Sequence, residues 1–366
     1  MAKYTYYFGN LVAGTISAAL PCKDVTYTQQ LNTPGSFSAS LNVSDPGVAN
    51  MDPITWTAPG KTALWIDRNG VLVWGGIIWG RTYDSTKYQI AISGSTFDSY
   101  GQRRYIDYDN VVTSTEQLTV AANLWNTMQT KAHGNINCPA VVTTPSGVTI
   151  NAQWLTTDRK RVIDAIKDLT NSATGFDYAV QVAWTSNLTT SQTMVFGYPN
   201  LGRIQSTNQL LFQYPGNIIS YTLSEDGASV ANTNLAFGAG SGATALVATA
   251  LNTSSLTNGY PVLEGGTSYK DITDPTQLQN FANADMYLYT NPPQQVTALV
   301  RGDLDPIIGS YNLGDYVMLQ ISDYRFPAIP GLPYGISAAY QIRNVSIAVD
   351  DQGVEHVTLT LMVAPS

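Results

Sequence analysis

Two segments near opposite ends of the chain alternate apolar and polar residues with a period of two. The apolar positions are Phe37, Ala39, Leu41 and Val43 in the first segment and Val357, Leu359, Leu361 and Val363 in the second. Successive side chains of a strand point to opposite faces of a sheet, so each segment predicts a strand with one buried and one polar face. The pattern therefore predicts antiparallel sheet in the first and last thirds of the chain.

A hairpin is the clearest local prediction. Two strand-like runs, residues 62–68 and 71–79, flank Asn69-Gly70. Asn-Gly between apolar runs favours a type I′ turn, because both central residues of that turn take positive φ. A third strand over residues 88–93 would complete a meander. Gly75-Gly76 inside the second run indicates a bulge or the close approach of another backbone.

The middle third changes to a helical period. Ser114 is predicted to cap a helix, with Gln117 at the capping-box position. A second helix is predicted over about residues 158–169. The alternating strand of residues 176–184 then favours a hairpin with residues 193–196. This order predicts a small α/β unit between two β-rich flanks.

The last third returns to strands and holds one further helix. Asp274 followed by Pro275 is a favoured helix start, and this helix is predicted over residues 274–288. Residues 225–273 are polar and glycine-rich, and we predict that they are rich in loops. The predicted strands are residues 210–214, 218–223, 295–300, 316–321, 340–349 and 355–363.

Charged residues make up only 12% of the 366 residues, and the net charge is −8. A nucleic-acid clamp needs clustered Lys and Arg, so the composition argues against one. The short basic runs Arg103-Arg104 and Arg159-Lys160-Arg161 are expected on solvated helix faces. The chain shows no signal-peptide pattern and no apolar run of membrane-spanning length, so we expect a soluble protein made in a cytoplasm.

Few residues carry catalytic or metal-binding chemistry. Cys22 and Cys138 are too few for a disulfide framework or a zinc site. Each is expected to be a small buried hydrophobe, and a long-range bridge between them stays open. His133 and His356 fall in different predicted domains without a Gly-X-Ser-X-Gly motif. The sequence therefore names no catalytic, cofactor-binding or metal-binding residue.

Acidic pairs are the remaining candidates for catalysis, because glycan hydrolysis uses two carboxyl groups. Asp107 with Asp109 and Asp303 with Asp305 flank predicted turns, where charged residues are expected without catalysis. Residues 238–243 spell Gly-X-Gly-X-X-Ala but lack the strand, helix and acidic residue of a dinucleotide site. We predict a mobile loop there, and a hairpin turn at the Arg-Gly-Asp sequence of residues 301–303.

Four of the seven tryptophans fall in the N-terminal strand region: Trp56, Trp65, Trp74 and Trp79. Such a cluster packs as core, forms a surface between subunits or offers a platform on which sugars stack. Core and interface are the more frequent roles, and the sequence leaves all three open.

Several soft patterns follow one another in a recognisable order. Residues 71–81 read V-L-V-W-G-G-I-I-W-G-R, residues 88–94 form the next strand, and a short segment ends in Arg103-Arg104-Tyr105-Ile106. Residues 313–317 (L-G-D-Y-V) and a closing hairpin over residues 341–363 come later. This order resembles siphophage minor tail proteins of the tail-hub family, also described as baseplate hub or tail-associated proteins, which are common in phages of actinobacteria. The resemblance covers most of the chain and is weakest over residues 225–273.

The resemblance implies an α+β, mainly β fold in which two tube-like antiparallel β-barrel domains flank a smaller α/β domain. Residues 1–110 would form the first barrel, residues 111–200 the α/β insertion and residues 201–366 the second barrel. Part of residues 201–225 would return to the first barrel. Three copies would form a ring whose six barrels match the sixfold rings of the tail above.

The resemblance also implies a structural role at the virion tail tip, after synthesis in the bacterial host cytoplasm. A homotrimeric hub would close or extend the tail tube and form part of the DNA exit channel, without enzymatic activity. Implied partners are a distal tail protein or tail-tube ring above, other minor tail or tail-tip proteins around it and, transiently, the tape measure protein. Stable nucleic-acid binding is not implied, and membrane contact would be indirect.

A channel that is acidic or neutral and polar would release DNA, whereas a basic one would hold phosphates. Charge-poor, tyrosine-rich surfaces also suit permanent subunit interfaces. Two alternatives stay open: a tail-tip adhesin that binds glycans through the tryptophan cluster, and a glycan hydrolase that uses Asp or Glu.

Overall fold

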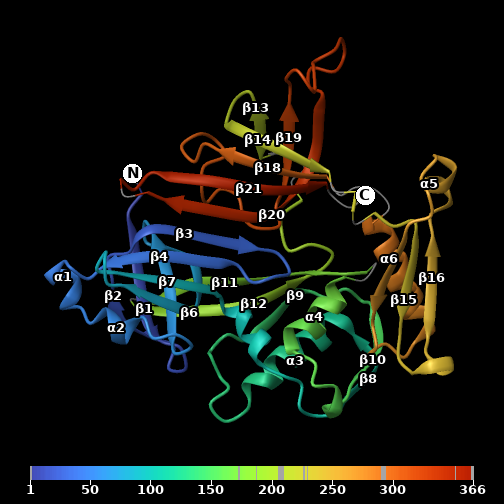
Figure 1. The fold of residues 1–366 in the computed structure, drawn as a ribbon, viewed down its shortest axis with the longest axis horizontal. Coiled ribbons are helices and arrows are strands. Elements are labelled where there is room, and N and C mark those ends of the chain that lie inside the picture. Colours follow the sequence, from blue (N-terminus) through green and yellow to red (C-terminus); the bar gives the residue numbers. More distant parts are fainter. Residues whose placement is uncertain are drawn as a thin grey trace.

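Most strands of the chain belong to one large sheet in the computed structural model (Figure 1). The structure describes residues 2–171, 174–186, 188–204, 210–225, 227–228, 230–289, 294–350 and 352–363, without the side chains of 287–289. The sheet has 13 strands in the order β14-β18-β21-β20-β3-β4-β7-β6-β5-β1-β2, and β19 with β13 branches from β20. Segments from the two ends of the sequence thus form a single sheet.

Most of the predicted strand segments are present, but β6 extends past the predicted residue 79 to Asp84 and β20 begins at Ile336, before the predicted residue 340. In the first third they are β1 (Tyr4–Asn10), β2 (Thr15–Ala19), β3 (Lys23–Gln30), β4 (Ser36–Asn42), β5 (Thr62–Arg68), β6 (Val71–Asp84) and β7 (Gln89–Thr96). In the last third they are β13 (Leu211–Tyr214), β14 (Ile218–Glu225), β18 (Gln294–Val300), β19 (Tyr316–Ile321), β20 (Ile336–Val349) and β21 (Glu355–Val363).

Two groups of six strands repeat one neighbour order. The first unit is β3-β4-β7-β6-β5-β1 and the second unit is β14-β18-β21-β20-β19-β13. Each unit contains a meander around a 14-residue strand, β6 or β20. Both long strands carry a register shift at the same place, between Ile78 and Gly80 in β6 and between Ile342 and Asn344 in β20. The chain therefore contains an internal structural repeat.

Each unit is rolled, but its backbone ladder is not closed. In the first unit Tyr4 of β1 meets Tyr27 of β3, with ring centroids 6.4 Å apart. In the second unit Tyr214 of β13 meets Tyr221 of β14, with ring centroids 5.3 Å apart. The α+β, mainly β class is confirmed. Among the described residues, the expected tube-like barrels are rolled sheets whose strand ladders stay open. In the first unit the free edge of β1 pairs with β2, so it cannot bond to β3.

The two units join edge to edge. β3 pairs with residues 344–349 of β20, on the edge that carries β19 farther along. Across this joint Glu355 of β21 binds Arg68 of β5, with Nε–Oε1 2.5 Å and Nη2–Oε2 2.8 Å, and accepts a bond from the Tyr4 hydroxyl. Burial opposes ionisation of Glu355, but these bonds outweigh it and hold the pKa of its carboxyl below the ordinary value.

A smaller α/β unit follows the first unit in the sequence. Its elements are β8 (Asn110–Glu116), α3 (Gln117–Gln129), β9 (Ala140–Thr144), β10 (Thr149–Trp154), α4 (Val162–Thr170), β11 (Asp177–Ser186) and β12 (Thr189–Gly197). The hairpin predicted between residues 176–184 and 193–196 is present as β11–β12, and β9 adds in parallel. The predicted cap at Ser114 is wrong, because β8 pairs with β10 as far as Glu116. Glu116 caps α3 instead, and its carboxylate accepts the Thr119 N–H.

Residues 225–273, predicted to be rich in loops, contain three strands. A sheet in the order β16-β15-β17 is covered by a helix (Figure 1). These elements are β15 (Thr233–Phe237), β16 (Val247–Leu251), α5 (Thr253–Thr257), β17 (Glu264–Ser268) and the covering helix α6 (Pro275–Tyr289). The strands are five residues long and bury small residues such as Ala236 and Ala248, so their apolar pattern is weak. Residues 238–243 lie in the connection between β15 and β16.

Two local predictions about glycine are confirmed. Asn69 and Gly70 both have positive φ, 55° and 86°, as a type I′ turn requires. A Cβ on Gly76 would overlap the Ser95 carbonyl oxygen of β7, which is the predicted close approach of another backbone. A Cβ on Gly75 would lie 2.6 Å from the Val182 side chain of β11. The α/β unit therefore crosses the first unit at this point, where only glycine leaves room. The three-part division at residues 110 and 200 stays a prediction.

Candidate channel and assembly surface

One face of the large sheet is apolar, and the other is mostly polar with charged residues only toward its ends. The apolar face packs into a core that extends through both units and includes Phe37, Trp74, Leu319 and Leu359. Because directly paired residues share a face, the strand registers assign the opposite side chains. These residues, the hydroxyl-lined face, are Ser220, Thr222, Ser224, Gln295, Thr297, Leu299, Thr358, Thr360, Met362, Asn344, Ser346, Ala348, Thr26, Thr28, Gln30, Ser36, Ser38, Ser40, Ala91, Ser93, Ser95, Gly80 and Thr82.

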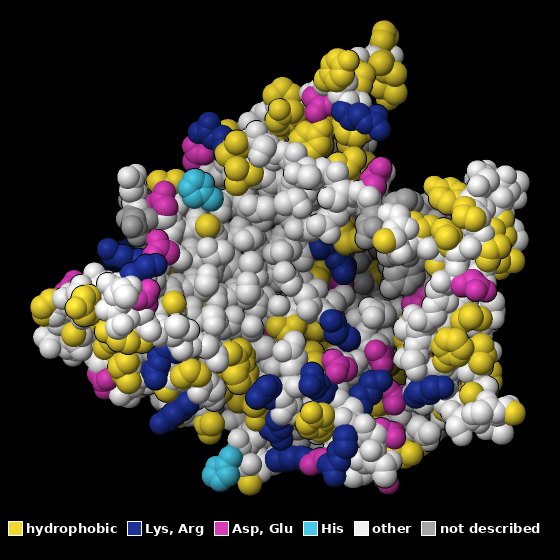
Figure 2. Space-filling view, viewed as in Figure 1, with side chains coloured by type: hydrophobic (Ala, Val, Ile, Leu, Met, Phe, Trp, Pro, Cys, Tyr) yellow, Lys and Arg dark blue, Asp and Glu magenta, His cyan; other side chains and the backbone are white. Residues whose placement is uncertain are grey.

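The hydroxyl-lined face crosses both units and the joint between them. Figure 2 shows a broad area without charged side chains over β20, β21, β3 and β4, with charges gathered toward its margins. Lys23, Asp84 and His356 lie at its ends. They pair directly with Ser40, Gln89 and Ala348, respectively. Ser, Thr, Asn and Gln offer hydrogen bonds but no ion pairs with phosphate. Such a surface can contact a polyanion without releasing counterions, so it gives no salt-dependent grip.

The four tryptophans do not form one exposed platform. Trp65 and Trp74 are fully buried, and the Trp74 indole donates to the Thr28 carbonyl at 2.9 Å. Trp56 and Trp79 are half-buried, and the Trp79 indole donates to the Ser99 hydroxyl at 2.8 Å. The cluster therefore serves mainly as core, one of the three roles that the sequence left open.

The cysteines and histidines lie apart. Cys22 and Cys138 are both free, and burial raises the pKa of each thiol. His133 is exposed in the α/β unit, whereas His356 is exposed on β21 with Nε2 3.7 Å from Asp350. Among the described residues, no group of three or more His, Cys, Asp or Glu is arranged to hold a metal ion.

The acidic pairs have structural partners. Asp107 forms an ion pair with Lys131, and Asp109 accepts the Thr156 N–H and hydroxyl, both at 2.7 Å. Asp303 binds Arg301 within the exposed turn, with Oδ2–Nη2 2.7 Å. The carboxylates of Asp107, Asp109 and Asp303 thus bind partners within the chain.

The basic clusters also bind within the chain. Arg104 donates to the Met128 carbonyl at 2.7 Å, where it satisfies the end of α3. Lys160 binds Asp168 of α4 and the buried Asp271. Burial opposes protonation of Lys160, but the two carboxylates outweigh it and raise the pKa of its ammonium group. Arg104 and Lys160 thus fix contacts within the chain.

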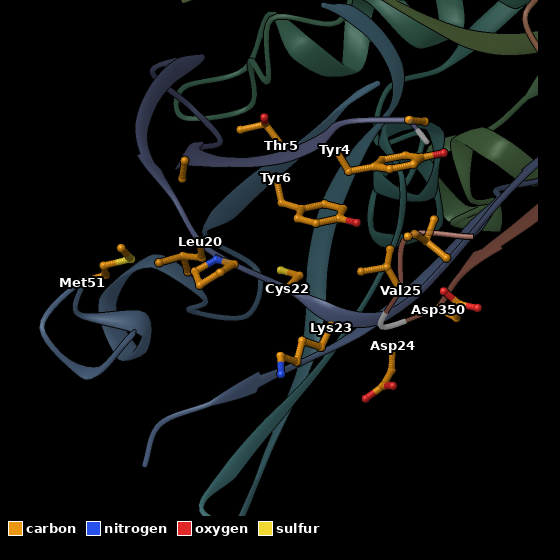
Figure 3. Close-up of a pocket in the computed structure, with 15 residues that line it drawn as sticks. Tyr4, Thr5, Tyr6, Leu20, Cys22, Lys23, Asp24, Val25, Met51 and Asp350 are labelled. Atoms are coloured by element: carbon orange, nitrogen blue, oxygen red, sulfur yellow. The ribbon is translucent and has the colours of Figure 1, made fainter. Parts of the chain in front are cut away.

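A shallow groove runs along the seam of the first unit. Figure 3 shows the Tyr4 and Tyr6 rings on one side and the Cys22 and Val25 side chains on the other, while Lys23 and Asp24 point away. Its volume is about 510 Å³. The groove follows from the open ladder between β1 and β3, and it holds no arrangement of catalytic groups.

The membrane criterion gives a negative result. Within the described ranges, no helix combines the length and the apolar character that crossing a membrane requires.

Solved structures that share this arrangement of strands include phage tail proteins. The tail protein from Neisseria meningitidis has a TM-score of 0.66 at 12% identity, over 99% of this chain and 96% of that one. The 43 kDa tail protein of prophage MuSo2 from Shewanella oneidensis has a TM-score of 0.61 at 10% identity, over 98% of both chains. No family model and no curated protein matches the sequence.

A secretion-system protein shares the arrangement. The E. coli c3393 protein is a component of the type VI secretion system with structural similarity to the bacteriophage T4 tail proteins gp27 and gp5. Its TM-score is 0.51 at 8% identity, over 98% of this chain and 77% of that one. The chain therefore has the phage tail-hub fold.

Proposed function

We propose that this chain is a structural virion protein that forms a homotrimeric hub at the tail tip of a siphophage. The observation that carries the proposal is the internal repeat, in which two units of the same strand order are joined edge to edge. Three copies supply six such units. A ring of three chains can then match a sixfold tail tube on one side and threefold parts on the other.

We propose further that the hydroxyl-lined face lines the DNA exit channel. It spans both units, so three copies would present six similar panels toward one axis. Apart from Lys23, which pairs with Ser40 at one end, its residues carry no positive charge that would bind phosphates. DNA would therefore pass without the counterion release that makes a basic surface adhesive.

The proposed partners are those of a tail-tip hub. A distal tail protein or tail-tube ring would bind above it, and other minor tail or tail-tip proteins below and around it. The tape measure protein would pass through transiently, and contact with the host membrane would be indirect. The chain itself would have no enzymatic activity, and the bacterial host cytoplasm would be its site of synthesis.

Native mass spectrometry of the purified chain, with electron microscopy of virions that carry it, tests the proposal. We expect a trimer and a single ring at the tail tip. A chain located elsewhere in the virion, or a ring with another copy number, would contradict it.

A glycan-array assay and release of reducing ends from cell-wall glycans test the adhesin and hydrolase alternatives. We expect neither binding nor release, because Trp65 and Trp74 lie inside the core. Glycan binding that disappears in Trp56→Ala or Trp79→Ala would instead favour the adhesin.

A further inference from the structure

Several strand edges of the large sheet are open in the described part of the chain, among them those of β2 and β13, and two others match the joint inside the chain. β14 ends the sheet and pairs only with β18, and residues 80–84 of β6 pair only with β7. β14 has the sequence I-I-S-Y-T-L-S-E, rich in strand-forming residues and without Lys or Pro. Natural proteins blunt such edges unless another strand covers them. A long, unprotected edge on β14 therefore calls for a partner.

The joint inside the chain gives the geometry of that partner. On β20, residues 336–341 pair with β19 and residues 344–349 pair with β3 along the same edge. On β6, residues 71–77 pair with β5, and the edge beyond them is empty. Residues 340 and 341 of β20 pair with both β19 and β21, and residues 76 and 77 of β6 pair with both β5 and β7. Residues 340 and 341 therefore correspond to residues 76 and 77. The empty edge of β6 thus corresponds to the part of β20 that binds β3.

β14 is the counterpart of β3 in the repeat. Across the first unit, Tyr27 of β3 pairs with Phe37 of β4, whose row continues through β7 to Ile78 of β6. Across the second unit, Leu223 of β14 pairs with Val296 of β18, whose row continues through β21 to Ile342 of β20. Ile78 and Ile342 each precede the register shift, so Tyr27 and Leu223 occupy equivalent positions. β3 uses its outer edge to bind β20. By the same plan, the outer edge of β14 fits the empty edge of a β6.

We infer that β14 of one copy pairs antiparallel with residues 81–84 of β6 in the next copy of this chain. The inference rests on the proposed function and names the surfaces through which the trimer closes. Transferring the β3–β20 register places Arg81 opposite Glu225, Thr82 opposite Ser224, and Tyr83 opposite Leu223. Each copy therefore uses its β14 edge to bind one neighbour and its β6 edge to bind the other.

The residues brought together are complementary. Arg81 and Glu225 have opposite charges, and directly opposed residues on neighbouring strands have Cβ atoms about 4.5–5.5 Å apart. Tyr83 is 53% exposed within one chain and would cover Leu223 of its neighbour. Thr82 and Ser224 both belong to the hydroxyl-lined face, so the new pair continues that face from one copy to the next.

The loop beside the β6 edge has the same course as its counterpart beside β20. Gly60 donates to the Ile78 carbonyl at 2.7 Å, and Gly314 donates to the Ile342 carbonyl at 2.8 Å. Both glycines have positive φ, 71° and 88°. The loop at Gly314 leaves room for β3, so the loop at Gly60 is expected to leave the same room for β14.

The pairing is head-to-tail, because different edges of the two copies meet. Such an interface produces a closed ring when its rotation closes and a filament when it does not. In this chain the same joint already connects the two units within each copy. Repeating it between copies makes all six unit-to-unit joints alike.

A cross-strand disulfide tests this register. We expect the double variant Thr82→Cys with Ser224→Cys to form a covalent trimer under mild oxidation, seen on a non-reducing gel and lost with reductant. Directly opposed residues have Cα atoms about 4.5–5.5 Å apart, inside the range that a disulfide spans. Six strands separate these positions within one chain, so the bond would form between copies.

The matched control is Thr82→Cys with Ser220→Cys. Ser220 lies on the same strand and the same face as Ser224 but four residues away, about 13 Å along a strand. We expect at least about tenfold less cross-linked product from this control, because its sulfur atoms cannot reach one another. Equal yields from the two variants would overturn the register.

Native mass spectrometry of the unmodified chain separates this inference from the proposed function. If the unmodified chain is a trimer but Thr82→Cys with Ser224→Cys forms no disulfide between copies, the edge pairing is overturned and the hub function stands. A chain that stays monomeric and is absent from the tail tip would overturn both.

Exchanging the charges of Arg81 and Glu225 gives a second test of the pairing, and this test does not depend on oxidation. Arg81 donates Nη1 to the Ile54 carbonyl and the Thr57 hydroxyl, so Arg81→Glu alone can disturb the loop that holds helix α2 (Pro53–Trp56). Glu225→Arg avoids that contact, and we expect it to weaken trimer formation about tenfold through the loss of one close charge pair. Combining it with Arg81→Glu should restore part of the trimer, because the charge pair returns while the Arg81 contacts with Ile54 and Thr57 stay lost. No change in Glu225→Arg would contradict the pairing.

Discussion

The two units share a strand plan but fill it differently. In the first unit Trp74 of β6 fills the interior, packs on Phe37 with ring centroids 5.5 Å apart and donates to a carbonyl of β3. The equivalent position in β20 is Ala338, which is exposed. The first unit is also covered by the α/β unit, which crosses it at Gly75. The interior and the outer covers therefore differ between the units.

The polar face differs much less. Ser36, Ser38 and Ser40 of β4 occupy the places of Gln295, Thr297 and Leu299 of β18. Ser93 of β7 corresponds to Thr360 of β21. Apart from Leu299, small or polar uncharged side chains thus recur on one face, while the side chains of the opposite face vary in size and shape. This difference indicates that the repeat serves a surface presented by both units rather than a common core.

The largest expected effect on stability is at Trp74, the position at which the two units differ most. Trp74→Ala should lower the free energy of unfolding by about 3–5 kcal/mol, because it empties the interior and removes an indole hydrogen bond. Ala338→Ser, at the equivalent exposed position, should change it by less than about 0.5 kcal/mol. Urea unfolding measures both. Similar losses in the two variants would mean that the units are packed alike.

The next largest effect on stability is expected at the joint between the units, where Glu355 binds Arg68. Glu355→Gln should cost about 3 kcal/mol, because it leaves the poorly exposed Arg68 without its carboxylate. The pKa of Glu355 is lowered on folding, so its contribution is present above its ordinary pKa of 4.5 and is lost as the pH falls further. Asp303→Asn removes an exposed pair and should cost less than about 1 kcal/mol. Equal costs would show that the joint does not depend on this ion pair.

A buried carboxyl group just after β7, that of Asp98, makes the stability of the first unit depend on pH. Asp98 is 2% exposed, and burial raises its pKa to about 6 despite a bond from the Thr96 hydroxyl. A raised carboxyl pKa means that the folded state binds the proton more tightly. Stability should therefore fall by roughly 2–3 kcal/mol as the pH rises from about 4 to about 6.

The Asp98→Asn variant isolates this contribution, because it cannot titrate. The difference in unfolding free energy between wild type and variant, measured by urea unfolding at several pH values, should follow that window. A difference that stays constant between about pH 4 and pH 6 would rule out titration of Asp98 in the folded chain.

The smallest effect on stability concerns the shared face. Ser38→Lys and its equivalent Thr297→Lys should each change the unfolding free energy by less than about 0.5 kcal/mol. Both should nevertheless give the trimer salt-dependent affinity for duplex DNA, because phosphate contacts release counterions. Thr253→Lys on α5, outside the hydroxyl-lined face, is the control. DNA binding that is equally strong in this control would show that the face has no special access to DNA.

Local signals in the sequence predicted local structure. The turn at Asn69-Gly70, the β20–β21 hairpin and the start of α6 at Pro275 each depend on a few neighbouring residues, so short patterns were sufficient. The cap at Ser114 was wrong because pairing with β10 determines where β8 ends. The strands in residues 225–273 were missed because alanine, threonine and glycine give little periodic contrast.

The candidate surface was only partly visible in the sequence. The alternation of residues 36–43 and 355–363 already implied polar faces on those strands. That these faces join depends on pairing between β3 and β20, which lie at opposite ends of the sequence. No local pattern carries such a long-range pairing. The low proportion of charged residues indicated the character of the face but not its location.

Electron microscopy of the assembled tail tip tests the central claim most directly. The account predicts a ring of three copies in which six repeated units surround one axis, with Ser38 and Thr297 facing the lumen. A ring with a different number of copies, or a lumen lined by another face of the sheet, would contradict it.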